Sequence, residues 1–230
     1  MASSLGPRTS SVPVLWLYGP SGVGKSTIAW EIFTRLPAET GRIGYLDLDQ
    51  LGMCYAPPTP QNWAPEPSSD HGRHRLQART LNAVLPNFAA VGVRGVVVSG
   101  VVDAGRGPDT DLLTNAALTT VRLRASPEVL RTRLAGRGRP DEDVDHIVTF
   151  AADLDRLTGL SLDTTALTVA ESIDEVQARV SGWPDATSEA IPSVQPTVGR
   201  LNDRDAAPPG QILWVCGPKA VGKSTVGWSL

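Results

Sequence analysis

The glycine-rich stretch at residues 19–26, which reads G-x-x-x-x-G-K-S, constrains the fold of this chain more than any other feature. It follows an apolar run, residues 12–18, and precedes a segment with helical character, residues 27–36. A strand, a glycine loop and a helix start in this order form a cradle for phosphates, because the backbone N–H groups turn inward around the anion. The stretch predicts an α/β fold with a nucleoside triphosphate site.

The residues expected to bind the nucleotide are Gly19, Pro20, Ser21, Gly22, Val23, Gly24, Lys25, Ser26 and Thr27. We expect Lys25 to reach the outer phosphates and to act in catalysis, and the Ser26 hydroxyl to bind Mg²⁺, so the predicted cofactors are ATP and Mg²⁺. Of the 21 lysine and arginine residues, only Lys25, Lys219 and Lys223 are lysine. Because a compact ammonium fits a tight loop and a planar guanidinium does not, this usage supports phosphate binding.

Two acids follow the next predicted strand, residues 43–49. A period of two places Asp47 and Asp49 on one face, near the carboxyl end of the strand, where open α/β sheets bind ligands. We expect at least one of them to be a general base or a Mg²⁺-linked carboxylate, and favour Asp49 because it lies nearer the mouth of the site. The alternative is a pair of solvated acids.

The third predicted strand, residues 95–103, lacks the acid that often follows such a strand and holds Mg²⁺ through water. Ser99 and Gly100 stand at that point, and Asp103 comes later. Asp103 is therefore a candidate for the metal site, although an ordinary loop aspartate is the favoured interpretation.

A predicted helix that begins at Ser126 carries several arginines toward its end: Arg131, Arg133, Arg137 and Arg139. Guanidinium groups beside a triphosphate suit the stabilisation of charge on a transferred phosphoryl group. The alternative is a surface helix with salt bridges.

The remaining pattern predicts a five-stranded, mainly parallel sheet flanked by helices in three layers, over residues 12–182. One predicted helix, residues 70–91, has an apolar face of Leu76, Leu81, Val84 and Leu85, and its basic first half is either solvated or an anion-binding surface. The other segments are predicted helices at 108–117, 141–157 and 172–180, the last with a Ser172–Glu175 capping box, and strands at 118–124 and 159–165.

The C-terminal part repeats the phosphate loop. Residues 212–228 match residues 14–30 at 10 of 17 positions. Residues 1–11 are expected to be loose, and residues 183–209 have linker composition. Residues 210–230 are expected to be a truncated second unit, which indicates the front part of a tandem-duplicated protein, and the alternative is a degenerate appendage whose strand adds to a sheet edge. Since this unit lacks the acids and arginines of the first, we do not expect it to bind nucleotide tightly.

Composition excludes several classes of function. A net charge of −3 gives no reason to expect binding to nucleic acid. No apolar run approaches the length of a membrane span. The first residues lack the apolar core of a signal peptide, so a cytoplasmic location is expected. Cys54 and Cys216 are expected to be free thiols. The oligomeric state stays open.

The chain resembles the P-loop kinase group, which includes adenylate, gluconate, shikimate and adenylylsulfate kinases, chloramphenicol phosphotransferase and zeta toxin-like enzymes. The resemblance covers residues 12–182 and is carried by residues 19–27, 46–49, 133–137 and 163–165. It implies that Arg133 lies beside the adenine and Arg137 on the phosphates, with Arg139 as a further contact. It also implies that Asp47 or Asp49 accepts the proton of the acceptor hydroxyl.

The sequence thus predicts an ATP- and Mg²⁺-dependent kinase for a small hydroxylated molecule that the sequence does not identify. Residues 50–95 match the acceptor pocket of no subfamily, and the segment between Gly136 and Asp141 is short for a lid. Two alternatives stay open. One is a nucleotide-dependent regulatory ATPase or switch protein, which the repeated loop favours, and the other is a pseudokinase that only binds nucleotide.

Overall fold

The computed structural model describes residues 11–36, 38–51 and 72–185, all within one compact unit. Its strands are β1 (Val12–Tyr18), β2 (Ile43–Asp47), β3 (Gly95–Gly100), β4 (Ala116–Arg124) and β5 (Ser161–Asp163). Its helices are α1 (Lys25–Arg35), α2 (Leu48–Leu51), α3 (Arg73–Ala90), α4 (Pro127–Ala135), α5 (Asp141–Leu154) and α6 (Val169–Arg179), with 3-10 turns at Ala38–Thr40 and Thr110–Leu112.

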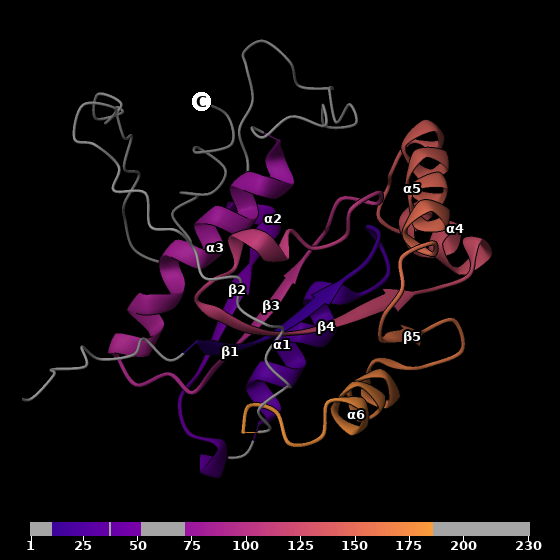
Figure 1. Ribbon diagram of the computed structural model, residues 1–230. Helices are drawn as coiled ribbons and strands as arrows, with labels where there is room; N and C mark the ends of the chain where they lie inside the picture. The colour runs from indigo at the N-terminus through magenta and orange to yellow at the C-terminus, as the bar shows by residue number, and fades with distance from the viewer. Residues whose placement is uncertain (1–10, 37, 52–71, 186–230) are drawn as a thin grey trace, which may run out of the picture. The chain divides into compact units, whose positions relative to one another are not determined.

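The five strands form one parallel sheet in the order β2-β3-β1-β4-β5 (Figure 1). Since all strands run the same way, their carboxyl ends meet at one edge, where the loop after β1 lies. The predicted three-layer α/β fold with a five-stranded sheet is confirmed. Residues 183–185 of the expected linker are described, and Trp183 packs against the core. The rest of the linker, the second phosphate loop and both cysteines lie outside the described residues.

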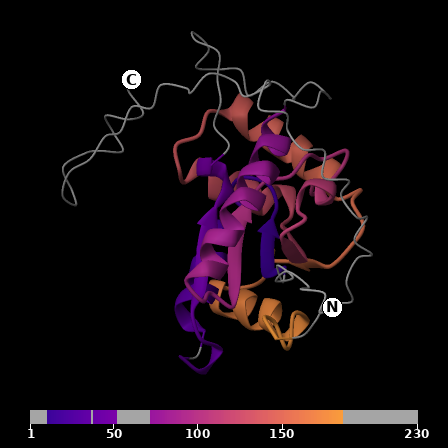
Figure 2. The same cartoon turned by 60° about the vertical axis from the view of Figure 1, so that its left-hand side comes forward.

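The apolar sequence of β1 follows from its central place in the sheet. Trp16 and Tyr18 are buried on one face, where α3 contributes Leu81 and Leu85. Leu17 is buried on the other face, which α1 and α6 cover (Figures 1 and 2). A strand with helices on both faces is apolar throughout, as predicted.

Three predicted details are wrong. Residues 108–117 hold only a short 3-10 turn and the start of β4, because Val12 at the start of β1 already pairs with Ala116. Leu76 is exposed, and Gln77 and Ala78 are fully buried in its place. The reason is periodicity, since positions 77, 78, 81 and 85 share one helix face and position 76 does not. Asp70, the expected cap of α3, lies outside the described residues, and Gly72 is the N-cap.

Two helix ends also differ from the predicted ones. The capping box of α6 is formed by Thr168 and Glu171, one turn before the predicted pair. Both pairs fit the S/T-x-x-E pattern, and the earlier start buries Ser172, whose hydroxyl donates to the Thr168 carbonyl. Helix α5 ends at Leu154 rather than residue 157, and the buried Arg122 of β4 donates to the Leu154 carbonyl there.

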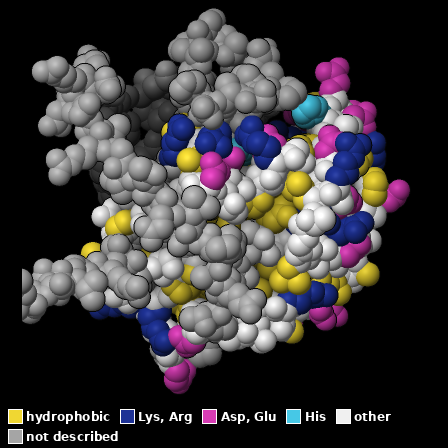
Figure 3. Space-filling model, viewed as in Figure 1, with side chains coloured by type: hydrophobic (Ala, Val, Ile, Leu, Met, Phe, Trp, Pro, Cys, Tyr) yellow, Lys and Arg dark blue, Asp and Glu magenta, His cyan; other side chains and the backbone are white. Residues whose placement is uncertain are grey.

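On the face shown in Figure 3, Lys and Arg side chains lie among Asp and Glu side chains, so no single sign of charge covers it. Within the described ranges, no helix is both long enough and apolar enough to cross a membrane.

The capping box of α6 gives a test of this fold. We expect Thr168→Ala to lower the free energy of unfolding by about 1 kcal/mol, because the Glu171 N–H loses its side-chain acceptor. Glu175→Ala, at the position that the sequence suggested, removes only an exposed pair with Arg179 and is expected to cost less than about 0.5 kcal/mol. Urea unfolding followed by circular dichroism measures both. Equal losses would contradict the assignment of the cap.

Candidate active site

The loop between β1 and α1 needs its glycines for reasons visible in the structure. A Cβ on Gly19 would lie 2.4 Å from the carbonyl oxygen of Leu123 at the end of β4, so a larger residue would force the loop off the sheet. Gly24, the N-cap of α1, has a φ of 101°, in the left-handed region that glycine tolerates. The backbone N–H groups of this helix start are therefore held at the carboxyl edge of the sheet.

Lys25 is the first residue of α1 and is only 8% exposed. Its ammonium lies 3.4 Å from the Oδ2 atom of Asp49. The sequence expected both residues at one site, and the structure brings them into contact.

The two acids reach the phosphate loop in a different way from the one predicted. Strand β2 ends at Asp47, and Asp49 lies in the one-turn helix α2, so the two do not share a strand face. The Asp49 N–H donates to Asp47 Oδ1 at 3.0 Å, a local bond that favours a turn over a continued strand. The Ser26 hydroxyl donates to Asp47 Oδ2 at 3.3 Å, so Asp47 lies at Ser26 and Asp49 at Lys25.

Asp49 is held by donors from two further elements. Its Oδ1 atom accepts the Val101 N–H at 3.2 Å, just after β3, and lies 3.6 Å from the Arg73 guanidinium of α3. Oδ1 is thus held by fixed groups, and Oδ2 faces the lysine. The sequence placed Arg73 in a basic segment without assigning it to the site; the run of cations at the start of that helix was the available signal.

Burial raises the pKa of Asp47, and the negative charge of Asp49 raises it further. The Asp49 N–H, the Lys25 ammonium and the Ser26 hydroxyl oppose the shift. A half-buried carboxylate with a raised pKa beside a hydroxyl suits a bound cation, because a cation would relieve the cost of its charge. In the described residues no cluster of three or more His, Cys, Asp or Glu could hold a metal. Mg²⁺ held at Ser26 and Asp47 would therefore draw its other oxygens from phosphate and water.

Ser99 occupies the position at the end of β3 where the sequence lacks an acid, and its hydroxyl is hydrogen-bonded within the sheet. Ser99 is fully buried and pairs in register with Asp47 on the neighbouring strand. Its Oγ atom lies 3.1 Å from the hydroxyl of Tyr45. The carboxylate nearest Ser26 is thus supplied by β2 and not by β3.

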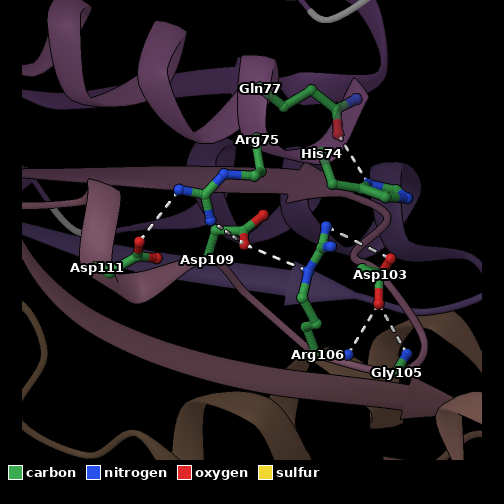
Figure 4. Close-up of polar contacts among 8 residues, drawn as sticks. All are labelled: His74, Arg75, Gln77, Asp103, Gly105, Arg106, Asp109 and Asp111. Carbon is green, nitrogen blue, oxygen red and sulfur yellow. Dashed lines mark hydrogen bonds and ion pairs between the residues drawn. The ribbon is translucent and has the colours of Figure 1, made fainter. Parts of the chain in front are cut away.

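Asp103 contacts its own loop. Its Oδ1 atom accepts the N–H groups of Gly105 and Arg106, and its Oδ2 atom lies 3.5 Å from the Arg106 guanidinium (Figure 4). None of the described hydrogen bonds joins Asp103 to Ser26. Its role at the metal stays a prediction.

The arginines of the α4 region divide into two groups. Arg133 donates to the Val23 carbonyl of the phosphate loop at 3.3 Å and to the Thr164 carbonyl after β5 at 3.1 Å, so it links the two loops. Arg137 is exposed after the end of α4, and Arg139 pairs with Asp143 at 3.5 Å. The structure brings Arg133 to the phosphate loop and places Arg137 and Arg139 on the turn between α4 and α5.

No protein-family model and no curated protein sequence matches the chain. Among solved structures, a sugar kinase from a Janibacter species has 19% identity and a TM-score of 0.52, over 77% of this chain and 99% of that one. The tunicamycin resistance protein of Deinococcus radiodurans has 22% identity and a TM-score of 0.51, over 74% and 96%. Such identities establish a shared fold and leave the reaction to be argued from the site. The chain has the fold of the P-loop kinase group.

The raised pKa of Asp47 predicts a gain in stability when its charge is removed. Above the pKa that Asp47 has in the folded protein, ionisation of this carboxyl opposes folding. The penalty begins to fall as pH drops below that pKa and is gone below the pKa of the unfolded chain. We therefore expect Asp47→Asn, without nucleotide or metal, to melt at the same temperature as the parent or higher at pH 7.5, and the difference to shrink in acid.

Thermal melts in EDTA at several pH values measure this difference. Asp103→Asn serves as the comparison, because its loop bonds to Gly105 and Arg106 need an oxygen that asparagine also offers. A melting temperature of Asp47→Asn clearly below that of the parent at pH 7.5 would contradict the prediction. In the presence of ADP, Mg²⁺ should lose its effect on the melting temperature in Asp47→Asn, and the same measurement on Asp103→Asn tests the metal role that the sequence predicts for Asp103.

Proposed function

We propose that this protein is an ATP- and Mg²⁺-dependent phosphotransferase that acts on a small hydroxylated acceptor. The observation that carries the proposal is the double contact between the phosphate loop and the turn after β2: Lys25 with Asp49, and Ser26 with Asp47. A loop that only binds nucleotide needs the cation and the hydroxyl, whereas transfer to an acceptor also needs a base at the outer phosphate. The pair of acids supplies that base and a metal-linked carboxylate.

In this proposal the loop N–H groups and Lys25 bind the β and γ phosphates, and Ser26 and Asp47 hold the metal. Bound Mg²⁺ would neutralise charge that develops on the phosphate oxygens. The Lys25 ammonium, which pairs with Asp49 in the structure, would turn toward the outer phosphates of the nucleotide. Asp49 Oδ2 would then be available to the acceptor.

Asp49 is proposed as the base. Its Oδ2 atom takes the hydroxyl proton while the acceptor oxygen bonds to the γ phosphorus and the bond from that phosphorus to the β–γ bridging oxygen breaks, leaving ADP. Val101 and Arg73 hold Oδ1, so the carboxylate is oriented before the acceptor arrives. Arg133 is proposed to lie beside the adenine. Its hydrogen bonds to the phosphate loop and to Thr164 support this position.

Arg137 and Arg139 are proposed to neutralise the transferred phosphoryl group. Both lie on or near the exposed turn between α4 and α5, so this role requires the turn to approach the phosphate loop when nucleotide binds. A cytoplasmic location, where ATP is available, is part of the same proposal.

The second candidate is a nucleotide-dependent switch or regulatory ATPase, favoured by the repeated phosphate-loop sequence at residues 212–228. It predicts ADP formation that no small molecule accelerates. A kinase predicts ADP formation that depends on one acceptor, and a pseudokinase predicts binding without turnover. A panel of hydroxylated metabolites, scored by ADP release, separates the three.

Removal of the loop lysine tests the proposal directly. We expect Lys25→Ala to lower acceptor-dependent ADP formation at least about 100-fold, since the transition state loses its main cation at the outer phosphates. Lys223→Ala, the matching change in the repeated loop, is expected to leave the rate unchanged. Circular dichroism checks that both variants fold. Full turnover by Lys25→Ala would refute the assignment.

The base has a separate test. We expect Asp49→Asn to lower kcat about 100-fold or more while the dissociation constant of a fluorescent ADP analogue changes little, because proton transfer is lost and the phosphate loop is kept. Asp185→Asn is the control, since Asp185 is an exposed acid that pairs with Arg94 just before β3. If Asp49→Asn and Asp185→Asn turned over equally, Asp49 would not be the base.

A further inference from the structure

Helix α3 carries a fully buried amide on its apolar face. Gln77 has no exposed surface and lies beside Ala78, among the residues that cover the sheet. Burying an amide is costly unless both of its ends are hydrogen-bonded. Its Nε2 atom donates to the Leu48 carbonyl at 2.9 Å, and its Oε1 atom lies 3.2 Å from Nδ1 of His74 (Figure 4). Both ends are therefore used, and the bond to a carbonyl fixes which end is the nitrogen.

The carbonyl that Gln77 binds belongs to the peptide unit that joins Leu48 to Asp49. The N–H of that same unit donates to Asp47 Oδ1. Since a peptide unit is planar, bonds at its two ends fix its orientation, and with it the direction in which the Asp49 side chain leaves the backbone. Helix α2 has only four residues, so its carbonyls have few partners within the helix, and the bond from Gln77 joins one of them to α3.

The start of α3 is itself fixed. Arg75 lies 3.2 Å from Asp109 and 3.3 Å from Asp111, and Arg106 lies 3.6 Å from Asp109, which is nearly buried. Figure 4 shows these pairs tying the helix to the loop between β3 and β4. Gln77 therefore binds the Leu48 carbonyl from a helix whose first turn is anchored to this loop.

We propose that Gln77 is a positioning residue that sets the geometry of both acids through the Leu48–Asp49 peptide unit, an inference that rests on the phosphotransferase proposed above. It acts on Asp47 and Asp49 together: the peptide unit carries Asp49, and its N–H holds the carboxylate of Asp47. A side chain of the same size without an N–H donor keeps the packing of α3 and loses this control.

The test uses Gln77→Met in the full chain, because methionine fills a similar volume and cannot donate to the Leu48 carbonyl. We expect kcat to fall about 10- to 100-fold, the size of effect seen when residues that support a site are removed. The affinity for a fluorescent ADP analogue in EDTA should stay within about twofold, since the phosphate loop is untouched. The gain in that affinity on adding Mg²⁺ should fall at least about fivefold.

Asn82→Ala is the matched control. Asn82 lies on the same helix and accepts the Asn115 N–H at 2.8 Å, so it is a polar tether of the same kind that does not contact the acids. We expect it to leave kcat and the Mg²⁺ effect within about twofold of the parent values. Should Gln77→Met fail to fold, His74→Ala removes the partner of Oε1 instead and is expected to give a smaller loss of kcat with the same sparing of affinity in EDTA.

The proposal is overturned if Gln77→Met keeps the kcat and the Mg²⁺ effect of the parent, or if Asn82→Ala reduces both to the same extent. Its failure can be told apart from failure of the proposed function. A parent protein without acceptor-dependent ADP formation refutes the phosphotransferase, whereas the Mg²⁺ effect on ADP binding still reports whether Gln77 positions the acids.

Discussion

The contact between the Lys25 ammonium and the Asp49 carboxylate joins the two halves on which the site depends. Lys25 is delivered by β1 and α1, and Asp49 by β2 and α2, with β3 lying between these strands in the sheet. The pair can form because parallel strands end at one edge and because the chain turns immediately after Asp47. The parallel arrangement of the strands is therefore required by the proposed chemistry as well as by packing.

Features encoded by local sequence could be predicted, and features set by packing between distant segments could not. The glycine loop, β1 and the start of α4 at Ser126 each depend on neighbouring residues, and the structure has them as predicted. The turn at Asp47 depends on a bond from the carboxylate to a backbone N–H, and period-two alternation cannot reveal it. Helix α6 offered two capping patterns one turn apart, and the burial of Ser172 distinguishes them.

The candidate site shows the same division. Lys25, Ser26 and the two acids could be named from motif and spacing, and the structure brings them together. Arg73 and Gln77 approach the acids from a helix more than 20 residues away in sequence, and no spacing rule connects the two segments. A buried glutamine among leucines was visible in the pattern of α3 only as an interruption of its apolar face.

Asp47 and Asp49 lie on one short turn, two positions apart. Asp47 contacts Ser26, and Asp49 contacts Lys25. An inserted or deleted residue within this turn would rotate one carboxylate away from its partner while the sheet stayed intact. Changes in the length of the flanking segments should therefore be tolerated more readily than a change in the spacing between these two acids. In homologues that share the proposed reaction, the two-residue separation should persist even where the surrounding sequence has diverged.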